Sequence, residues 1–502
     1  MTPRPDRVKI VQSDLEGKIY WTWTWGGEPQ VAVTPSRQVA KLRGLLAEAL
    51  PGALPGEVTD ADLAPVPAKL RALGGLAAGG SLPERYRGPH GDAPTLAAGT
   101  SKAEDRRRAE VLRTHRCLTG PLSTPDREAR WAADLAQALV PGQLLAEIGE
   151  RARTNQPFEF LIMVSGDCAA VPWEILPVAE GKVLLDVATV THFAPMTQRD
   201  FSGVPPRRWG ATKALRPLWV IDPRLGRGNG WHVLDEDEHA EWARLAAVDG
   251  GTMRVAVDYD RIELSRDLLP DGSQPGLDSK AGRFFYLGHV AGGDDDPQST
   301  SLLLGCGSRV YSTATMSGPV RGFSARDALM GTIDFAEANA DRRTRYPDAA
   351  LADGMPREVP GNQLWPMPAR VALIACDSGS DFRHAEPFGL VTAFFEAGAE
   401  LITATRWALI TDRAFGCYSD AGRHPLQEAA LAVDAAHRGE RPVADIGAWQ
   451  RERLARWRCD GELADSPLTW AALANHVWRP RANPLPPGLE GLVDEKAEGA
   501  GG

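Results

Sequence analysis

The sequence has no run of about 18 consecutive apolar residues, which a membrane-spanning helix would require. Its first ten residues also lack the apolar stretch of about 7–15 residues that defines a secretory signal peptide. Basic residues are not in excess: 66 acidic residues outnumber 56 basic ones and give a net charge of −10, so no general field attracts nucleic acid or an anionic membrane. These absences predict a cytoplasmic protein without a direct nucleic-acid or membrane partner.

Cysteines are few and scattered. Six occur among 502 residues, and no two of them form a C-x-x-C pair. Secreted disulfide scaffolds are short and dense in cysteine, so this spacing predicts free thiols in a reducing compartment. Most of these thiols should lie in the core, because unpaired cysteine is among the most buried residue types.

Motifs that bind phosphate are also missing. The chain has no G-x-x-x-x-G-K-[ST] loop and no G-x-S-x-G nucleophile elbow. Residues 226–230 are rich in glycine, but the third glycine comes one residue too early for a dinucleotide loop. Three consecutive aspartates at 294–296 are typical of a solvated turn. The sequence therefore offers no support for a nucleotide-binding or serine-hydrolase site.

Short apolar runs alternate with helix-like segments between residues 105 and 478, and this alternation is the signature of an α/β sheet. The runs are apolar enough to be covered by helices on both faces. The expected strands are 158–164, 217–221, 253–257, 283–288, 370–376 and 400–407, and the expected helices include 125–139, 236–247, 324–336 and 387–397.

Residues 1–73 have a different pattern and are expected to form a small α+β module. Aromatic residues and threonines alternate from Tyr20 to Trp25, which predicts a β-hairpin. A helix should follow, with Ser36 as its N-cap. The stripe of Trp21, Trp23 and Trp25 is a candidate surface for binding an extended or proline-rich peptide, although tryptophans at this spacing more often cover a sheet.

Two stretches are expected to lack a packed core. Residues 74–104 are rich in Gly, Ala and Pro without periodicity, which is typical of a linker. Residues 480–502 are polar and rich in Pro and Gly, which is typical of a disordered tail.

Two reactive residues follow expected strands. His289 comes directly after 283–288, and Cys376 ends 370–376. Ligands gather at the carboxyl ends of strands in a parallel sheet, so the two residues would meet if their strands are neighbours. An imidazole beside a thiol promotes its ionisation and can later protonate a leaving amine. The pair is therefore a candidate catalytic dyad, although a single histidine or cysteine in such a position is more typical of a structural role.

The order of these segments resembles the CHAT domain, a caspase-like group of clan CD cysteine peptidases related to separase. The most specific matches are A-C-D-S-G at 375–379 and G-L-V-T-A-F-F-E-A-G-A at 389–399. VPWEILPV at 171–178, VIDPRLG at 220–226 and SPLTWAALANHV at 466–477 are similar to further segments of the family. The resemblance implies a caspase-like sheet with helices on both faces, in which 105–250 is a pseudo-caspase-like half and 251–479 the catalytic half.

This resemblance implies a cysteine endopeptidase that cleaves a protein substrate without a metal or organic cofactor. Cys376 would be the nucleophile and His289 the general base and acid. The backbone N–H groups of Val290 and Cys376 would stabilise the oxyanion. The candidates for the substrate pocket are Asp377, Arg406 and Trp407. Such domains in bacteria are often regulated effectors in defence or signalling, so an activating protein partner is also expected.

One departure from the family pattern leaves an alternative open. Many CHAT sequences read H-F-A-G-H-G with the second histidine catalytic, whereas this chain has Gly293 in that place. In that register the acid/base is missing, and the protein is an inactive scaffold that binds a partner through the same groove. The register favoured here aligns His289 with the single catalytic histidine of other caspase-like sequences.

Overall fold

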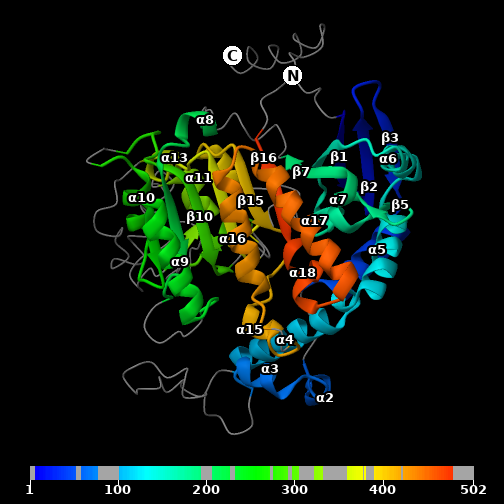
Figure 1. Ribbon diagram of the computed structural model, residues 1–502, viewed down its shortest axis with the longest axis horizontal. Coiled ribbons are helices and arrows are strands. Elements are labelled where there is room, and N and C mark those ends of the chain that lie inside the picture. Colours follow the sequence, from blue (N-terminus) through cyan, green and yellow to red (C-terminus); the bar gives the residue numbers. More distant parts are fainter. Residues whose placement is uncertain are drawn as a thin grey trace, which may run out of the picture.

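The main feature of the computed structural model is a mixed sheet of 11 strands flanked by helices (Figure 1). The α/β class predicted from the sequence is therefore confirmed. The structure describes residues 6–52, 58–76, 101–193, 206–225, 232–271, 275–291, 297–304, 322–331, 359–376, 378–379, 389–419 and 422–478.

All six strands predicted from apolar runs are present in this sheet, in which the strand order is β3-β2-β1-β4-β7-β16-β15-β14-β10-β8-β9. The bounds are β1 (Asp6–Leu15), β2 (Lys18–Thr24), β3 (Gln30–Thr34), β4 (Phe158–Met163), β7 (Ala188–Phe193), β8 (Arg216–Ile221), β9 (Thr252–Val255), β10 (Ala281–Gly288), β14 (Arg370–Ala375), β15 (Leu401–Thr405) and β16 (Leu473–Val477).

The sheet consists of two parallel blocks that run in opposite directions. Strands β1, β4, β7 and β16 pair in parallel with their neighbours and form the first block. Strands β15, β14, β10, β8 and β9 form the second block in the same way. The two blocks meet where β15 pairs with β16 in the antiparallel sense. This division differs from the expected one at residue 250, because β8 belongs with β10 and because the last strand, β16, belongs to the first block.

The expected N-terminal module is not separate from the main sheet. β1 pairs in parallel with β4 from Asp6↔Phe158 to Val11↔Met163, and the antiparallel strands β2 and β3 continue the sheet beyond β1. Trp21 and Trp23 are fully buried beneath it. These two rings therefore cover the sheet and are not exposed for recognition of a partner.

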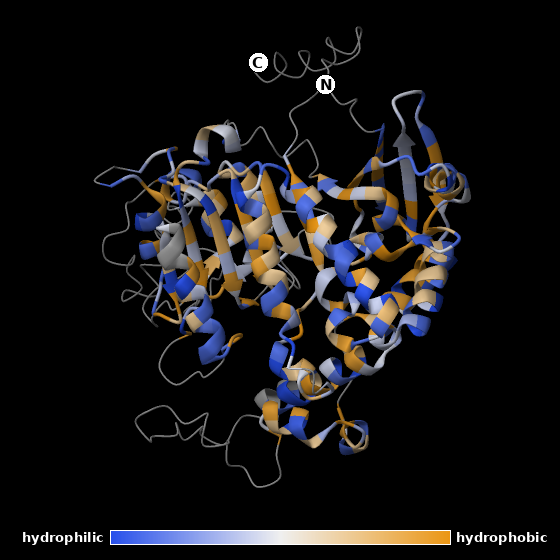
Figure 2. Ribbon diagram, in the orientation of Figure 1, coloured by the Kyte–Doolittle hydropathy of each residue, from blue (hydrophilic) through white to orange (hydrophobic). Residues whose placement is uncertain are grey.

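Helices cover both faces of the second block. Alternate side chains of β8, β10 and β14 pack on one face against α9 and α16, and the others pack on the opposite face against α10, α11 and α14. Hydrophobic residues accordingly run along the strands in the middle of the molecule (Figure 2). The helices around this block are α9 (Glu236–Asp249), α10 (Arg261–Leu268), α11 (Ala325–Met330), α13 (Gly361–Leu364), α14 (Leu390–Glu396), α15 (Asp412–Phe415) and α16 (Pro425–Arg438).

The remaining helices differ from the sequence predictions at two places. They are α1 (Ser36–Ala49), α2 (Asp60–Leu63), α3 (Ala68–Leu73), α4 (Ser101–Thr119), α5 (Pro125–Leu139), α6 (Gly142–Arg153), α7 (Leu184–Val187), α8 (Trp209–Thr212), α17 (Pro442–Asp460) and α18 (Pro467–Trp470). Ser36 is the first residue of α1 and not its N-cap, since Pro35 occupies that position and no side chain caps the helix. The last residues of the expected linker are the first turn of α4. Residues 77–100 of that linker and the tail 480–502 lie outside the described residues.

Among the described residues, no helix has both the length and the hydropathy needed to cross a membrane.

Candidate active site

His289 and Cys376 lie at the ends of two strands that are direct neighbours. β10 pairs in parallel with β14 from Arg283↔Arg370 to Gly288↔Ala375, and each of the two residues comes directly after the last of these pairs. Adjacent strands are about 4.8 Å apart. The structure therefore brings the two sequence-predicted residues to neighbouring positions on one edge of the sheet.

The main chain at His289 is held in place by Tyr286, a fully buried residue of β10. The Tyr286 hydroxyl can donate its single proton to either of two carbonyl oxygens. The oxygen of His289 lies 2.7 Å away and that of Leu303 lies 2.9 Å away. The Leu303 N–H donates a further hydrogen bond of 2.8 Å to the His289 carbonyl. Burial raises the pKa of Tyr286 well above its usual value, so the hydroxyl stays protonated as a donor.

Gly288 precedes His289 for a steric reason. A Cβ atom at this position would lie 2.8 Å from the Tyr286 hydroxyl, which is closer than real contacts allow. The next residue, Val290, begins the short strand β11 (Val290–Ala291), which pairs with β12 (Ser301–Leu302), and β12 in turn pairs with β13 (Phe323–Ser324). The proposed oxyanion donor at Val290 therefore belongs to a second, small sheet beside the end of β10.

Cys376 is partly exposed, and its Sγ lies 3.9 Å from the carbonyl oxygen of Leu409. Leu409 belongs to the segment that follows β15, so the chain after that strand passes the thiol. The other described cysteines are also free thiols, as expected. Cys117 and Cys168 are fully buried, and burial raises the pKa of Cys117 to about 12. Cys417 is partly exposed and Cys459 is exposed, which makes them useful references for reactivity.

Ser378 and Gly379 of the A-C-D-S-G motif anchor the turn after Cys376 onto β15. The Ser378 hydroxyl donates to the Leu373 carbonyl at 2.7 Å and accepts from the Thr405 N–H at 3.0 Å. The Gly379 N–H donates to the Thr405 carbonyl at 2.9 Å. These contacts give the motif a structural role in fixing the backbone around the thiol.

Arg406 and Trp407 do not line an open pocket. Both side chains are buried, with exposed fractions of 2% and 1%. The Arg406 guanidinium donates to both carboxylate oxygens of Glu174, at 2.7 and 2.8 Å. The Trp407 indole donates to the Leu468 carbonyl at 2.9 Å. Their assignment as substrate-pocket residues is therefore corrected, because the end of β15 is covered by other segments of the chain. Asp377 and Gly293 lie outside the described residues.

The Arg406–Glu174 ion pair joins the two blocks of the sheet and was not predicted. Arg406 follows β15 of the second block, whereas Glu174 lies in a turn after β4 of the first. Arg406 also lies 3.1 Å from Nε2 of His192, and the His192 ring is 5.2 Å from that of His476 between ring centres. Both histidines are fully buried, and burial lowers the pKa of His476 to about 3 and that of His192 in the same direction. The junction therefore contains one ion pair and two neutral histidines.

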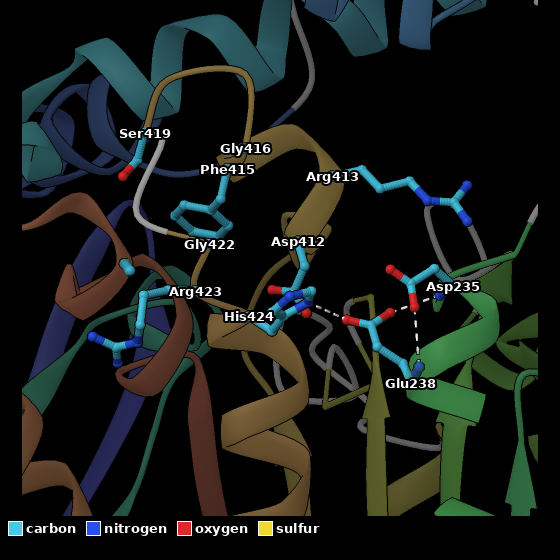
Figure 3. A pocket seen from close by; sticks show the side chains of 11 residues that line it. Asp235, Glu238, Asp412, Arg413, Phe415, Gly416, Ser419, Gly422, Arg423 and His424 are labelled. Atoms are coloured by element: carbon cyan, nitrogen blue, oxygen red, sulfur yellow. Dashed lines mark hydrogen bonds and ion pairs between the residues drawn. The ribbon is translucent and has the colours of Figure 1, made fainter. Parts of the chain in front are cut away.

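A cavity of about 330 Å³ lies between α9, α15 and the chain that leads into α16 (Figure 3). In it, Nδ1 of His424 is 2.6 Å from a carboxylate oxygen of Glu238. Asp412 accepts the backbone N–H groups of Leu426 and Gln427 at 2.7 and 3.0 Å and so caps α16. Burial raises the pKa of Asp412 to about 7. The acidic groups of this cavity are therefore largely engaged by the protein itself.

A further polar cluster lies at the end of β8, which pairs with β10 on the side opposite to β14. Asp222 comes directly after β8, the other neighbour of β10, and its N–H donates to the Leu287 carbonyl at 2.6 Å. Its carboxylate lies against His232 and His239. Sequence reasoning missed this cluster because His232 follows a Gly-rich stretch and His239 lies in a charged helix, so neither histidine directly follows an apolar run. The only available signal was an aspartate at the end of a strand.

Comparison with known proteins assigns no family: no protein-family model matches the chain, and no curated protein matches it. The resemblance to the CHAT domain therefore stays a prediction from the motifs quoted above.

Proposed function

We propose that the protein is a cysteine endopeptidase of the CHAT, caspase-like type, with Cys376 as the nucleophile and His289 as the general base and acid. The observation that supports this most directly is the parallel pairing of β10 with β14, whose last pair, Gly288↔Ala375, immediately precedes both residues. The caspase-like identity of the fold is part of the same proposal.

The reaction would proceed in two steps. His289 takes the proton of the Cys376 thiol, and the thiolate attacks the scissile carbonyl carbon. The tetrahedral intermediate collapses as the C–N bond breaks, and the imidazolium gives its proton to the leaving amine. A water molecule, deprotonated by His289, then hydrolyses the thioester and releases the thiol and a carboxylic acid.

The oxyanion would be stabilised by the N–H groups of Val290 and Cys376. The three-centre arrangement at Tyr286, Leu303 and the His289 carbonyl supports this proposal, because it fixes the peptide unit that carries the Val290 N–H. Preorganised donors of this kind typically contribute about 10²–10³ in rate.

The substrate would be a protein, and by resemblance to bacterial CHAT domains activity would depend on an activating protein partner. The alternative, an inactive scaffold that binds a partner through the same groove, differs in one measurable property. Only an enzyme needs Cys376 to be more reactive than an ordinary thiol.

An electrophilic peptide probe tests the proposal directly. We expect the probe to modify Cys376 and no other cysteine at low dose, as read by mass spectrometry of the intact and digested protein. Cys376→Ala should abolish labelling, and His289→Ala should slow it by about 10²–10⁴-fold. The matched control, Cys417→Ala, removes another partly exposed thiol and should change nothing. Equal labelling of Cys376 and Cys417, with and without His289, would favour the inactive scaffold.

A further inference from the structure

Three side chains that are typical metal ligands converge outside the proposed dyad. Asp222 follows β8, His232 lies in the segment that leads into α9, and His239 lies near the start of α9. Each offers one ligand atom, and these three atoms all lie within 4.8 Å of one another. The convergence brings together two elements, the end of a strand and a helix packed against it.

The distances in this cluster are those of ligands around a common centre. Nδ1 of His232 and Nε2 of His239 lie 3.1 and 2.9 Å from the same oxygen, Oδ2 of Asp222. A metal with bonds of about 2.0–2.1 Å separates adjacent ligand atoms by about 2.8–3.4 Å in octahedral or tetrahedral geometry. The two N–O separations lie within this range.

Four nitrogen atoms surround the Asp222 carboxylate, and three of them lie against Oδ2, which also accepts the Leu234 N–H at 3.2 Å. A cation would bind the lone pairs of both imidazoles and remove two of the three competing donors. The Val233 N–H, which donates to Oδ1 at 3.0 Å, would remain to orient the carboxylate, as outer hydrogen bonds do in metal sites.

The cluster is also accessible from one side. The Asp222 side chain is 1% exposed, whereas those of His232 and His239 are 34% and 15% exposed. The two rings meet edge to face at an interplanar angle of 81°. The floor of the site is therefore buried, and its histidine side is open to solvent.

We propose that Asp222, His232 and His239 bind one divalent transition-metal ion, with Zn²⁺ as the preferred ion. Two imidazoles and one carboxylate with an open fourth position form a ligand set that Zn²⁺ favours. The site would link β8 to α9 at the same edge of the sheet as His289. It is independent of the proposed peptidase chemistry, which uses no metal, and it adds a metal to a chain whose sequence predicts none.

A neighbouring group, Asp235, Glu238 and His424, provides the matched control. Here the contacts are explained without a metal. The Asp235 N–H donates to Glu238 at 2.6 Å, the Glu238 N–H donates to Asp235 at 3.0 Å, and His424 contacts the remaining oxygen of Glu238. This reciprocal pair caps α9, as Figure 3 shows by dashed lines. His424→Gln therefore removes a nearby histidine without removing a ligand of the proposed site.

The test uses the full chain, stripped with a chelator and titrated with Zn²⁺ against a chromophoric competitor. We expect one Zn²⁺ per chain with a Kd below about 1 μM. His239→Gln and His232→Gln should each weaken binding at least about 100-fold, and His424→Gln should leave it unchanged. In the wild-type protein, Co²⁺ should give the intense visible absorption of a four-coordinate site.

Two results would overturn the proposal. One is a wild-type protein that binds Zn²⁺ no more tightly than about 10 μM. The other is retention of wild-type affinity in both His232→Gln and His239→Gln. If one variant fails to fold, the other variant and the Co²⁺ spectrum of the wild-type protein still decide the question.

Discussion

The two blocks of the sheet contain histidines in different positions, and the difference separates candidate reactive groups from structural ones. In the second block, Asp222, His289 and Cys376 each come directly after a strand, on the three neighbours β8, β10 and β14. In the first block, His192 and His476 are within β7 and β16, pair with each other in register and are fully buried. His289 and Cys376 are partly exposed after their strands, whereas His192 and His476 are buried within theirs.

The junction between the blocks should be the most sensitive point for stability. Arg406→Met leaves the buried carboxylate of Glu174 without its partner, and this should lower the free energy of unfolding by about 3–5 kcal/mol. Urea denaturation followed by circular dichroism measures the effect. Arg406→Met combined with Glu174→Leu removes both charges and should recover much of the loss. If the free energy of unfolding of Arg406→Met lies within about 1 kcal/mol of the wild-type value, the junction does not depend on this pair.

The buried histidines of the first block predict a loss of stability in acid. Their pKa values are lowered in the folded protein, so the unfolded chain binds more protons below its own pKa of about 6.5. Stability should be fully present above about pH 6.5 and decrease as the pH falls toward 3, by about 1.4 kcal/mol per pH unit for each histidine. Chemical denaturation between pH 7.5 and 5 measures this slope.

His424, in the cavity beside the second block, should behave in the opposite way. Partial burial opposes its charge, but the hydrogen bond to Glu238 and the charges of the nearby carboxylates together raise the pKa of His424. Its contribution to stability should be present below about pH 6.5 and disappear as the pH rises through the raised value. His424→Gln should therefore be more destabilising at pH 5.5 than at pH 8. Equal destabilisation by His424→Gln at pH 5.5 and at pH 8 would contradict this opposite pH dependence.

Tyr286 should affect reactivity without touching the substrate. Tyr286→Phe removes the hydroxyl that fixes the His289 carbonyl, and we expect labelling of Cys376 by a peptide probe to slow about tenfold. The control is Tyr259→Phe, which removes a buried hydroxyl bonded to Asp267 in the same block. Both variants should lower stability by about 1–3 kcal/mol. A similar slowing in both would mean that Tyr286 acts through stability alone.

Local patterns were sufficient to predict most of the second block. Its inner strands are short apolar runs, which burial on both faces requires, whereas the edge strand β9 is only partly buried; the bounds of these strands agree with the sequence to within a few residues. β7 and β16 were missed because Thr191, His192, Asn475 and His476 interrupt their apolar character, and these residues are buried through contacts distant in sequence. The pairing of β1 with β4 joins segments about 150 residues apart, so no local pattern indicates it.

The candidate site was predictable to a similar extent. A histidine and a cysteine at strand ends can be read from the sequence, and their adjacency needs only neighbouring strands. The burial of Arg406 and Trp407 could not be read, because Glu174 and Leu468 approach β15 from far along the chain. Asp222 and His239 are also close in space only because α9 packs against β8.

The pH dependence of Cys376 alkylation tests the central claim most directly. The rate with iodoacetamide, followed by mass spectrometry, should reach half its maximum well below the value of about 8.5 for an ordinary thiol, and His289→Ala should return it to about that value. Exposed Cys459 serves as the reference within the same protein. An ordinary profile for Cys376 that is identical in the wild type and His289→Ala would contradict the proposed dyad.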